Sequence, residues 1–139
     1  QNLIPLVMEV AIGTKSKINI YGNDYSTIDG TGVRDYVHVN DLAIAHIKAI
    51  SYLKKERRNL TLNLGTGVGF SVLEVINKVR EVSGKNISFE IVNRREGDPD
   101  IVIAKADLAK KLINWESKSS DLDSIIASTW NLYKGKAVF

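Results

Sequence analysis

Apolar residues recur at helical spacing in some stretches of the chain and alternate with polar residues in others. Residues 3–11 carry apolar side chains three to four positions apart, with Asn2 as a candidate cap and Gly13 as a stop signal. Residues 17–21 alternate and predict a strand. Residues 22–32 are polar and glycine-rich, and a loop of this length in a compact domain is usually functional.

A second strand and a longer helix are predicted after this loop. Residues 33–39 alternate as a strand, and Asn40 or Asp41 would open the helix. His38 and His46 have no partner at metal-ligand spacing, so His46 is expected to pack on the helix. The expected buried face of this helix comprises Leu42, Ala45, His46, Ala49, Ile50 and Leu53.

Three glycines follow a third predicted strand, residues 60–64. Gly65, Gly67 and Gly69 lack the spacing of a dinucleotide-binding turn, since the third glycine comes one residue too early. The pattern instead predicts a tight turn that brings the backbone close to a ligand or a neighbouring domain. The helix after it begins with a capping box, Ser71-Val72-Leu73-Glu74, and ends at Gly84. Its expected buried face is Val72, Val75, Ile76, Val79 and Val82.

The remaining elements are short. A strand over 87–91, a polar loop over 93–100, a brief extended segment over 101–104, and helices over 107–113 and 121–133 are predicted. Helices and strands alternate, but the strands are few, so the sequence predicts a small mixed α+β domain covering residues 1–139. Trp115 and Trp130 are expected to be core anchors.

Composition narrows the class of protein. With 44% hydrophobic and 25% charged residues the 139-residue chain is typical of a globular domain, and no apolar run is long enough to cross a bilayer. Zero cysteines exclude disulfides and thiolate metal sites and fit a reducing compartment, so we expect a cytoplasmic protein. The net charge is only +3, and no aromatic residue interrupts the basic run 54–58, so nucleic acid is not an expected partner. The chain does not begin with Met, and we expect it to be part of a longer protein.

Arg34 is the first candidate for binding chemistry. It opens the strand after the Gly30–Gly32 loop, where a rigid fork of donors suits a phosphate group. Residues 94–98 (RREGD) supply a second candidate fork. The alternative is a solvated ion pair of Arg34 with Asp35 or Asp41.

These motifs together resemble a known family. The chain is similar to the C-terminal half of UDP-glucose 4-epimerases, which are extended short-chain dehydrogenases/reductases. The matching segments, in family order, are Asn2-Leu3-Ile4-Pro5, 18–25 (INIYGNDY), 30–43 (GTGVRDYVHVNDLA), 63–69 (NLGTGVG), 71–73 (SVL), 94–98 (RREGD) and Asn114-Trp115.

The resemblance implies a fold and a reaction. In this family a small C-terminal lobe packs against a Rossmann lobe that binds NAD, and the sugar nucleotide lies between them. Bound NAD removes a hydride from C4 of the hexose and returns it to the opposite face, which interconverts UDP-glucose and UDP-galactose through a 4-keto intermediate. The family's Tyr-x-x-x-Lys and Gly-x-x-Gly-x-x-Gly motifs are not found here. The resemblance therefore implies no catalytic or cofactor-binding residue in this chain, an inactive lobe when alone, and a homodimer when complete.

The resemblance also assigns substrate contacts. It places Arg34 and Arg95 on the phosphates and Asp98 on a ribose hydroxyl, and leaves Arg94 and Glu96 as structural residues that pair with each other or across the lobe interface.

Further contacts of the nucleotide follow from the same resemblance. Asn2 beside Leu3 would supply a polar contact. The base would lie along Asn19-Ile20-Tyr21, with the Tyr21 ring covering its face.

One position departs from an aromatic residue found in the family. Four residues beyond Asp98, the family has a side chain that closes the sugar pocket, and here it is the small Val102. We expect the complete enzyme to accept N-acetylated UDP-hexoses as well as UDP-glucose and UDP-galactose.

Three other functions stay open at this point. The chain could be the substrate lobe of another sugar-nucleotide enzyme, a 4,6-dehydratase or decarboxylase, although RREGD directly after a strand argues against it. It could be a non-catalytic module that binds sugar nucleotides or anions. It could also be a globular domain whose arginines are ordinary surface charges.

Overall fold

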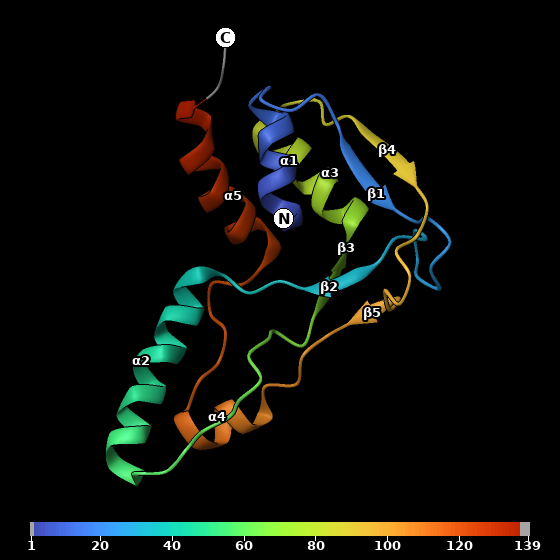
Figure 1. Ribbon diagram of the computed structural model, residues 1–139. Coiled ribbons are helices and arrows are strands. Elements are labelled where there is room, and N and C mark those ends of the chain that lie inside the picture. Colours follow the sequence, from blue (N-terminus) through green and yellow to red (C-terminus); the bar gives the residue numbers. More distant parts are fainter. Residues whose placement is uncertain (1, 137–139) are drawn as a thin grey trace.

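The computed structural model describes residues 2–136 and shows a mixed α+β fold, as the sequence predicts (Figure 1). No helix within these residues has both the length and the apolar character to cross a membrane. The helices are α1 (Leu3–Ala11), α2 (Val39–Glu56), α3 (Val72–Ser83), α4 (Asp107–Ile113), α5 (Leu122–Tyr133) and the short 3₁₀ helix η1 (Lys134–Lys136). The strands are β1 (Ile18–Tyr21), β2 (Val33–Asp35), β3 (Gly69–Ser71), β4 (Phe89–Val92) and β5 (Ile101–Val102).

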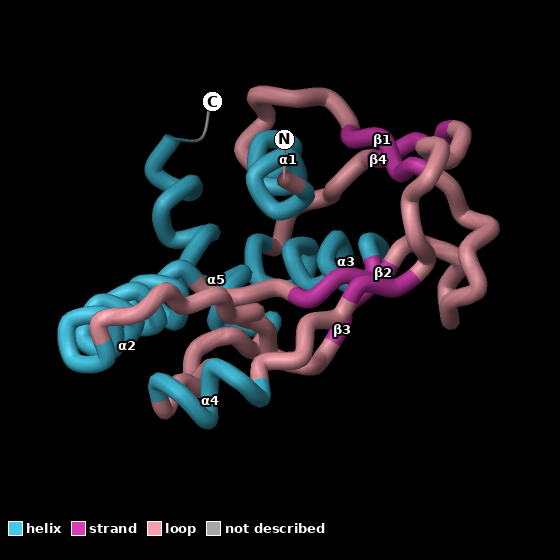
Figure 2. The backbone as a smooth tube through the Cα atoms, turned by 60° about the horizontal axis from the view of Figure 1, so that its bottom comes forward, coloured by secondary structure: helices cyan, strands magenta, loops and turns pink. Residues whose placement is uncertain are grey.

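The strands form two small sheets. β1 and β4 run parallel, with Ile18 opposite Phe89. In the second sheet the order is β3-β2-β5, where β3 is antiparallel and β5 parallel to β2. The central position of β2 places Arg34 between Phe70 and Val102. The tube in Figure 2 shows β2 crossing the molecule between α3 and the extended segments around α4.

The first core gathers α1, α3 and α5 against β1. Its buried side chains come from helix positions three or four apart and from one face of the strand, as the sequence pattern predicts. The capping box of α3 is present, and Gly84 ends the helix with a left-handed backbone. The first core consists of Val7, Met8, Val10, Ala11, Ile18, Ile20, Val75, Ile76, Val79, Ile87, Leu122 and Ile126.

The second core is smaller and lies beside α2 and α4, away from the three-helix group in Figure 1. Ala45, Ala109, Ile113 and Trp115 are its buried residues. Trp115 is an anchor, as predicted: it is 1% exposed, and its indole N–H donates to the backbone carbonyl of Asp41 at 2.8 Å. Trp130, by contrast, is only partly buried against the first core.

The buried Asp41 carboxylate ties the start of α2 to the chain before α5. It accepts hydrogen bonds from the backbone N–H groups of Lys118 and Ser119 and from the hydroxyl of Ser120. Burial raises the pKa of Asp41, but these three hydrogen bonds outweigh burial and leave the pKa below its ordinary value. Asp41 is therefore a structural carboxylate and not the partner of Arg34 that the sequence left open.

Two predicted strands differ from the structure. The strand over 33–39 ends at Asp35, because His38 caps a helix that already begins at Val39. The segment 60–64 forms no strand, since no described residue pairs with its backbone as a strand does. Its leucines still alternate in burial and pack against the second core. The alternating pattern thus indicated correctly which side chains face the core. A strand also requires a neighbouring strand to pair with its backbone, and the pattern does not report on that.

The predicted buried face of α2 is wrong for most of its length. Within α2 only Asp41 and Ala45 are fully buried, whereas Ile50 is 53% exposed and Leu53 42% exposed. His46 is also exposed, and its Nδ1 contacts the backbone carbonyl of Leu42 at 2.7 Å. The helix has an apolar face, but the described chain covers only its beginning and the flank beside α4.

Candidate functional site

A cavity of about 1020 Å³ lies between the beginning of α1, the end of β1, β2 with the segment after it, and α5. The structure brings eight of the nine predicted substrate-binding residues to this cavity, from four segments of the chain. They are Asn2, Leu3, Asn19, Ile20, Tyr21, Arg34, Arg95 and Asp98.

Val102 is the predicted residue that does not line the cavity. It lies on β5 in register with Arg34 and is 46% exposed. Its position beside the arginine strand keeps it close to the cavity, and its expected role at the sugar pocket stays a prediction.

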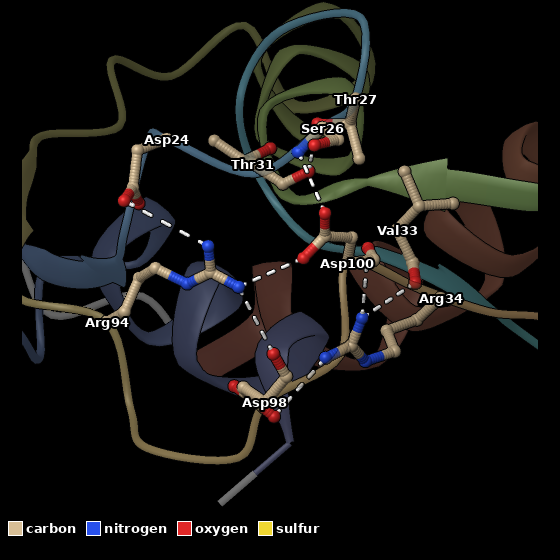
Figure 3. A network of polar contacts seen from close by, with 9 residues as sticks. All are labelled: Asp24, Ser26, Thr27, Thr31, Val33, Arg34, Arg94, Asp98 and Asp100. Carbon is tan, nitrogen blue, oxygen red and sulfur yellow. Dashed lines mark hydrogen bonds and ion pairs between the residues drawn. The ribbon is translucent and has the colours of Figure 1, made fainter.

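Arg34 is held in place by the backbone on one side of its guanidinium. Nη1 donates to the carbonyl oxygen of Val33 at 2.8 Å, while Nη2 contacts Oδ1 of Asp98 at 3.3 Å (Figure 3). The alternative pairing with Asp35 or Asp41 is wrong, because both of those carboxylates bind backbone N–H groups elsewhere. The side chain is 29% exposed, so the fork reaches the cavity without leaving water entirely.

The Asp35 carboxylate occupies the backbone donors of the three-glycine turn. The N–H groups of Thr66 and Gly67 donate to the Asp35 carboxylate at 3.0–3.1 Å, and the Thr66 hydroxyl donates to it at 2.7 Å. Gly65 fits because a Cβ there would lie 2.4 Å from the Cβ of Ala104. The turn is tight, as predicted, but an internal carboxylate occupies the donors that a phosphate would need.

Arg95 lies on the opposite side of Asp98 from Arg34. A turn in which Gly97 has φ +77° brings Asp98 back beside Arg95, whose Nε contacts Oδ2 of Asp98 at 3.2 Å. The Arg95 guanidinium also stacks on the Tyr21 ring, 4.5 Å from its centroid. Arg95 therefore already covers one face of the Tyr21 ring, the ring that is expected to cover a base.

Arg94 has structural contacts, as the resemblance implies, but its acidic partners are Asp24 and Asp100 and not Glu96. Its guanidinium carbon lies 3.9 Å from the centroid of the Tyr25 ring. Its Nη2 contacts Oδ1 of Asp100 at 2.9 Å (Figure 3). A Cβ at Gly22 would come within 2.4 Å of the Arg94 side chain, so the glycine permits this packing. Arg94 thereby fixes the loop that carries Arg95.

The loop over 22–32 is attached to the beginning of α3. The Asp29 carboxylate accepts hydrogen bonds from the hydroxyl groups of Thr31 and Ser71 and from the Thr31 N–H. Burial raises the pKa of Asp29, but these hydrogen bonds outweigh it and lower the pKa overall. The loop is thus a rigid wall beside Arg34 rather than a free segment.

Two residues of the cavity wall were missed by sequence reasoning. Burial raises the pKa of Tyr36 to about 12, against the opposing charge of Arg34, so its phenol stays neutral at physiological pH. Tyr36 follows Arg34 by two residues, which is the spacing that puts two side chains on one face of an extended segment. That spacing was the available signal for Tyr36. No signal in the sequence indicated that His38 caps α2, because histidine is not a preferred capping residue.

His38 lies close to Ser128, but the pair is not a nucleophile with its base. Nδ1 of His38 accepts the Asn40 N–H at 3.0 Å, so in the neutral ring Nε2 carries the proton and donates to the Ser128 hydroxyl at 2.8 Å. The Ser128 hydroxyl in turn donates to the carbonyl of Ile125. A serine nucleophile would need the reverse arrangement.

A second cavity of about 540 Å³ lies beside the three-glycine turn and α4. Lys105, Lys110 and Lys118 line it together with Asp107 and Glu116. The three lysines and two carboxylates leave a formal charge of +1, and Lys110 already contacts Glu116 at 2.5 Å. This cavity holds no pair of arginines and none of the predicted site residues.

The comparisons with known proteins agree with the motifs. Residues 1–129 match the family described as GDP-mannose 4,6 dehydratase. A UDP-glucose 4-epimerase of Lacticaseibacillus casei is 43% identical over 96% of this chain, which corresponds to 40% of that protein. The chain thus spans about 40% of the length of such relatives.

Solved structures give the same result. A UDP-glucose 4-epimerase from Stenotrophomonas maltophila, crystallised with NAD and formylated UDP-arabinopyranose, aligns with a TM-score of 0.91 at 43% identity and covers 98% of this chain and 40% of its own. The UDP-Glc/GlcNAc 4-epimerase from Campylobacter jejuni aligns with a TM-score of 0.82 at 41% identity. The alignment covers 96% of this chain and 40% of the Campylobacter chain. The chain therefore belongs to the GDP-mannose 4,6 dehydratase family, which confirms the resemblance to extended short-chain dehydrogenases/reductases.

Proposed function

We propose that this chain is the part of a UDP-glucose 4-epimerase that holds the UDP portion of the substrate. One observation carries the proposal: Arg34 and Arg95, from distant segments, converge on a single anionic group at the wall of the large cavity. Forked cations that meet at one anion are the arrangement that binds a pyrophosphate. The named relatives, which are UDP-glucose 4-epimerases, support the same function.

The reaction explains why the nucleotide should be bound more tightly than the hexose. A 4-epimerase must let the hexose present both faces of C4 while it retains the intermediate, so the energy of binding has to come from the remote nucleotide. In this proposal Arg34 and Arg95 bind the phosphates, and the Asp98 carboxylate accepts a hydrogen bond from a ribose hydroxyl. The base lies along Asn19–Tyr21, on the backbone edge or on the Tyr21 face that Arg95 leaves open.

The cofactor belongs to residues beyond this chain in the proposal. The resemblance implies NAD, which supplies the hydride chemistry when bound. The three-glycine turn does not fit a dinucleotide, because Asp35 occupies the N–H groups of Thr66 and Gly67. We place NAD on a Rossmann lobe and propose that this lobe covers the exposed apolar face of α2, within a cytoplasmic homodimer. The chain alone would then be inactive.

Titration of UDP by calorimetry tests the proposal. In the complete protein that carries this chain, Arg34→Ala and Arg95→Ala should each weaken UDP binding about 10- to 100-fold, because each removes charge-assisted hydrogen bonds to phosphate. Lys105→Ala removes the same charge from the second cavity and should leave UDP affinity within about twofold. Unchanged affinity in both arginine variants would reject the proposal.

The proposal extends to the size of the sugar. Val102 is small, and one structural neighbour is named for both UDP-Glc and UDP-GlcNAc. We propose that the complete enzyme epimerises UDP-GlcNAc, and that Val102→Tyr lowers kcat/KM for UDP-GlcNAc at least tenfold more than for UDP-galactose. Assays of both substrates on both enzymes check this. A wild type inactive on UDP-GlcNAc, with no effect of Val102→Tyr, would contradict it.

A further inference from the structure

Asp98 stands where an anionic ligand of the two arginines would bind. Its Oδ1 is 3.3 Å from Nη2 of Arg34, and its Oδ2 is 3.2 Å from Nε of Arg95. The two oxygens of one carboxylate thus bridge two guanidinium groups that belong to different segments of the chain. Any phosphate that uses the same nitrogen atoms has to compete with this carboxylate.

The bridge is built so that it can open. Both contacts are longer than the 2.7–2.9 Å of a strong charge-assisted hydrogen bond. The Arg95 side chain is 65% exposed and that of Asp98 is 26% exposed, so water and other anions can replace the contact. Arg34 is different, because its Nη1 stays anchored on the carbonyl of Val33 at 2.8 Å. Asp98 can leave without disturbing the position of Arg34.

We propose that Asp98 is a specificity-determining residue that selects ribonucleoside diphosphates over bare phosphates. It acts as an internal counter-anion of Arg34 and Arg95, and it yields them to a ligand whose ribose hydroxyls bind the released carboxylate. This inference rests on the proposed function, since it takes the cavity to be a nucleotide site.

The selection follows from charge. Two arginines and one aspartate leave the cluster with a single positive charge, and inorganic pyrophosphate must either displace Asp98 or lie beside a like charge. In the first case the carboxylate loses its partners and gains none, which is unfavourable for a partly buried charge. In the second case the carboxylate and the pyrophosphate are like charges that repel each other. A nucleotide replaces the lost contacts with hydroxyl donors, so only the nucleotide recovers the cost of opening the bridge.

Calorimetric titration of pyrophosphate and of UDP tests the inference in the complete protein. Asp98→Asn removes the internal charge with little change of shape. Pyrophosphate should then bind about five- to tenfold more tightly, because the full charge of both arginines is available. UDP should gain less or lose affinity, so that the ratio of the UDP to the pyrophosphate association constant falls at least fivefold. Glu96→Gln removes the same charge from an exposed position of the same loop and should leave the ratio within about twofold.

A second probe isolates the hydroxyl groups. Wild type should bind UDP more tightly than 2′,3′-dideoxy-UDP, and Asp98→Asn should reduce that preference. Equal loss of pyrophosphate and UDP in Asp98→Asn would show that Asp98 only positions the arginines, and the inference would be wrong. An unchanged pyrophosphate affinity would also overturn it. A wild type that binds no UDP would instead reject the proposed function itself.

Discussion

The two hydrophobic cores of this chain close to different degrees. In the first core Met8 and Ile76 have no exposed surface, because α1, α3, α5 and β1 cover one another. Beside the second core, α2 leaves Ile44 43% exposed and Ile47 64% exposed. An apolar stripe on an uncovered helix is the usual mark of a surface that meets another body of protein. The first core is complete within this chain, and the second is not.

The largest expected effect separates the two cores. Met8→Ala should lower the free energy of unfolding by about 2–5 kcal/mol, since it leaves a cavity among fully buried neighbours. Ile47→Ala should change it by less than about 0.5 kcal/mol in the 139-residue chain, because that side chain is mostly in water. Urea unfolding of both variants measures the difference. Similar losses would mean that α2 is packed in solution more tightly than this structure shows.

A smaller effect tests the hydrogen bonds by which Asp41 connects the beginning of α2 to the segment before α5. Asp41→Asn should lower the free energy of unfolding by about 1.5–3 kcal/mol, the value of hydrogen bonds to a charged group. The folded pKa of Asp41 is lowered, so its contribution is complete above the unfolded value of about 3.9 and disappears as the pH falls through the folded pKa. Unfolding curves at neutral pH and between about pH 4 and 2 provide the measurement.

The two pH ranges should give different results. At neutral pH the variant should be less stable than wild type, and the two should converge in acid, where Asp41 is protonated in wild type as well. A stability difference that stays constant down to about pH 2 would contradict the assigned role of the carboxylate.

Local sequence signals predict the elements of the first core correctly. Ser71 and Glu74 fix the beginning of α3, and Gly84 fixes its end, because caps depend on residues only a few positions apart. The motif positions also indicated the residues around the cavity, since eight of nine line it.

Features that depend on distant partners could not be predicted from pattern alone. The segment 60–64 alternates like a strand, but no strand lies beside it in the described part of the chain. Arg94 and Arg95 are neighbours in sequence, yet one stacks on Tyr25 and the other on Tyr21. Their different roles come from which tyrosine and which aspartate the fold brings near each of them.

A crystal structure of the complete protein with UDP tests the central claim most directly. The account expects the phosphates between Arg34 and Arg95, the uracil along Asn19–Tyr21, and Asp98 turned from the arginines toward the ribose. UDP in the second cavity, against Lys105 and the three-glycine turn, would contradict it.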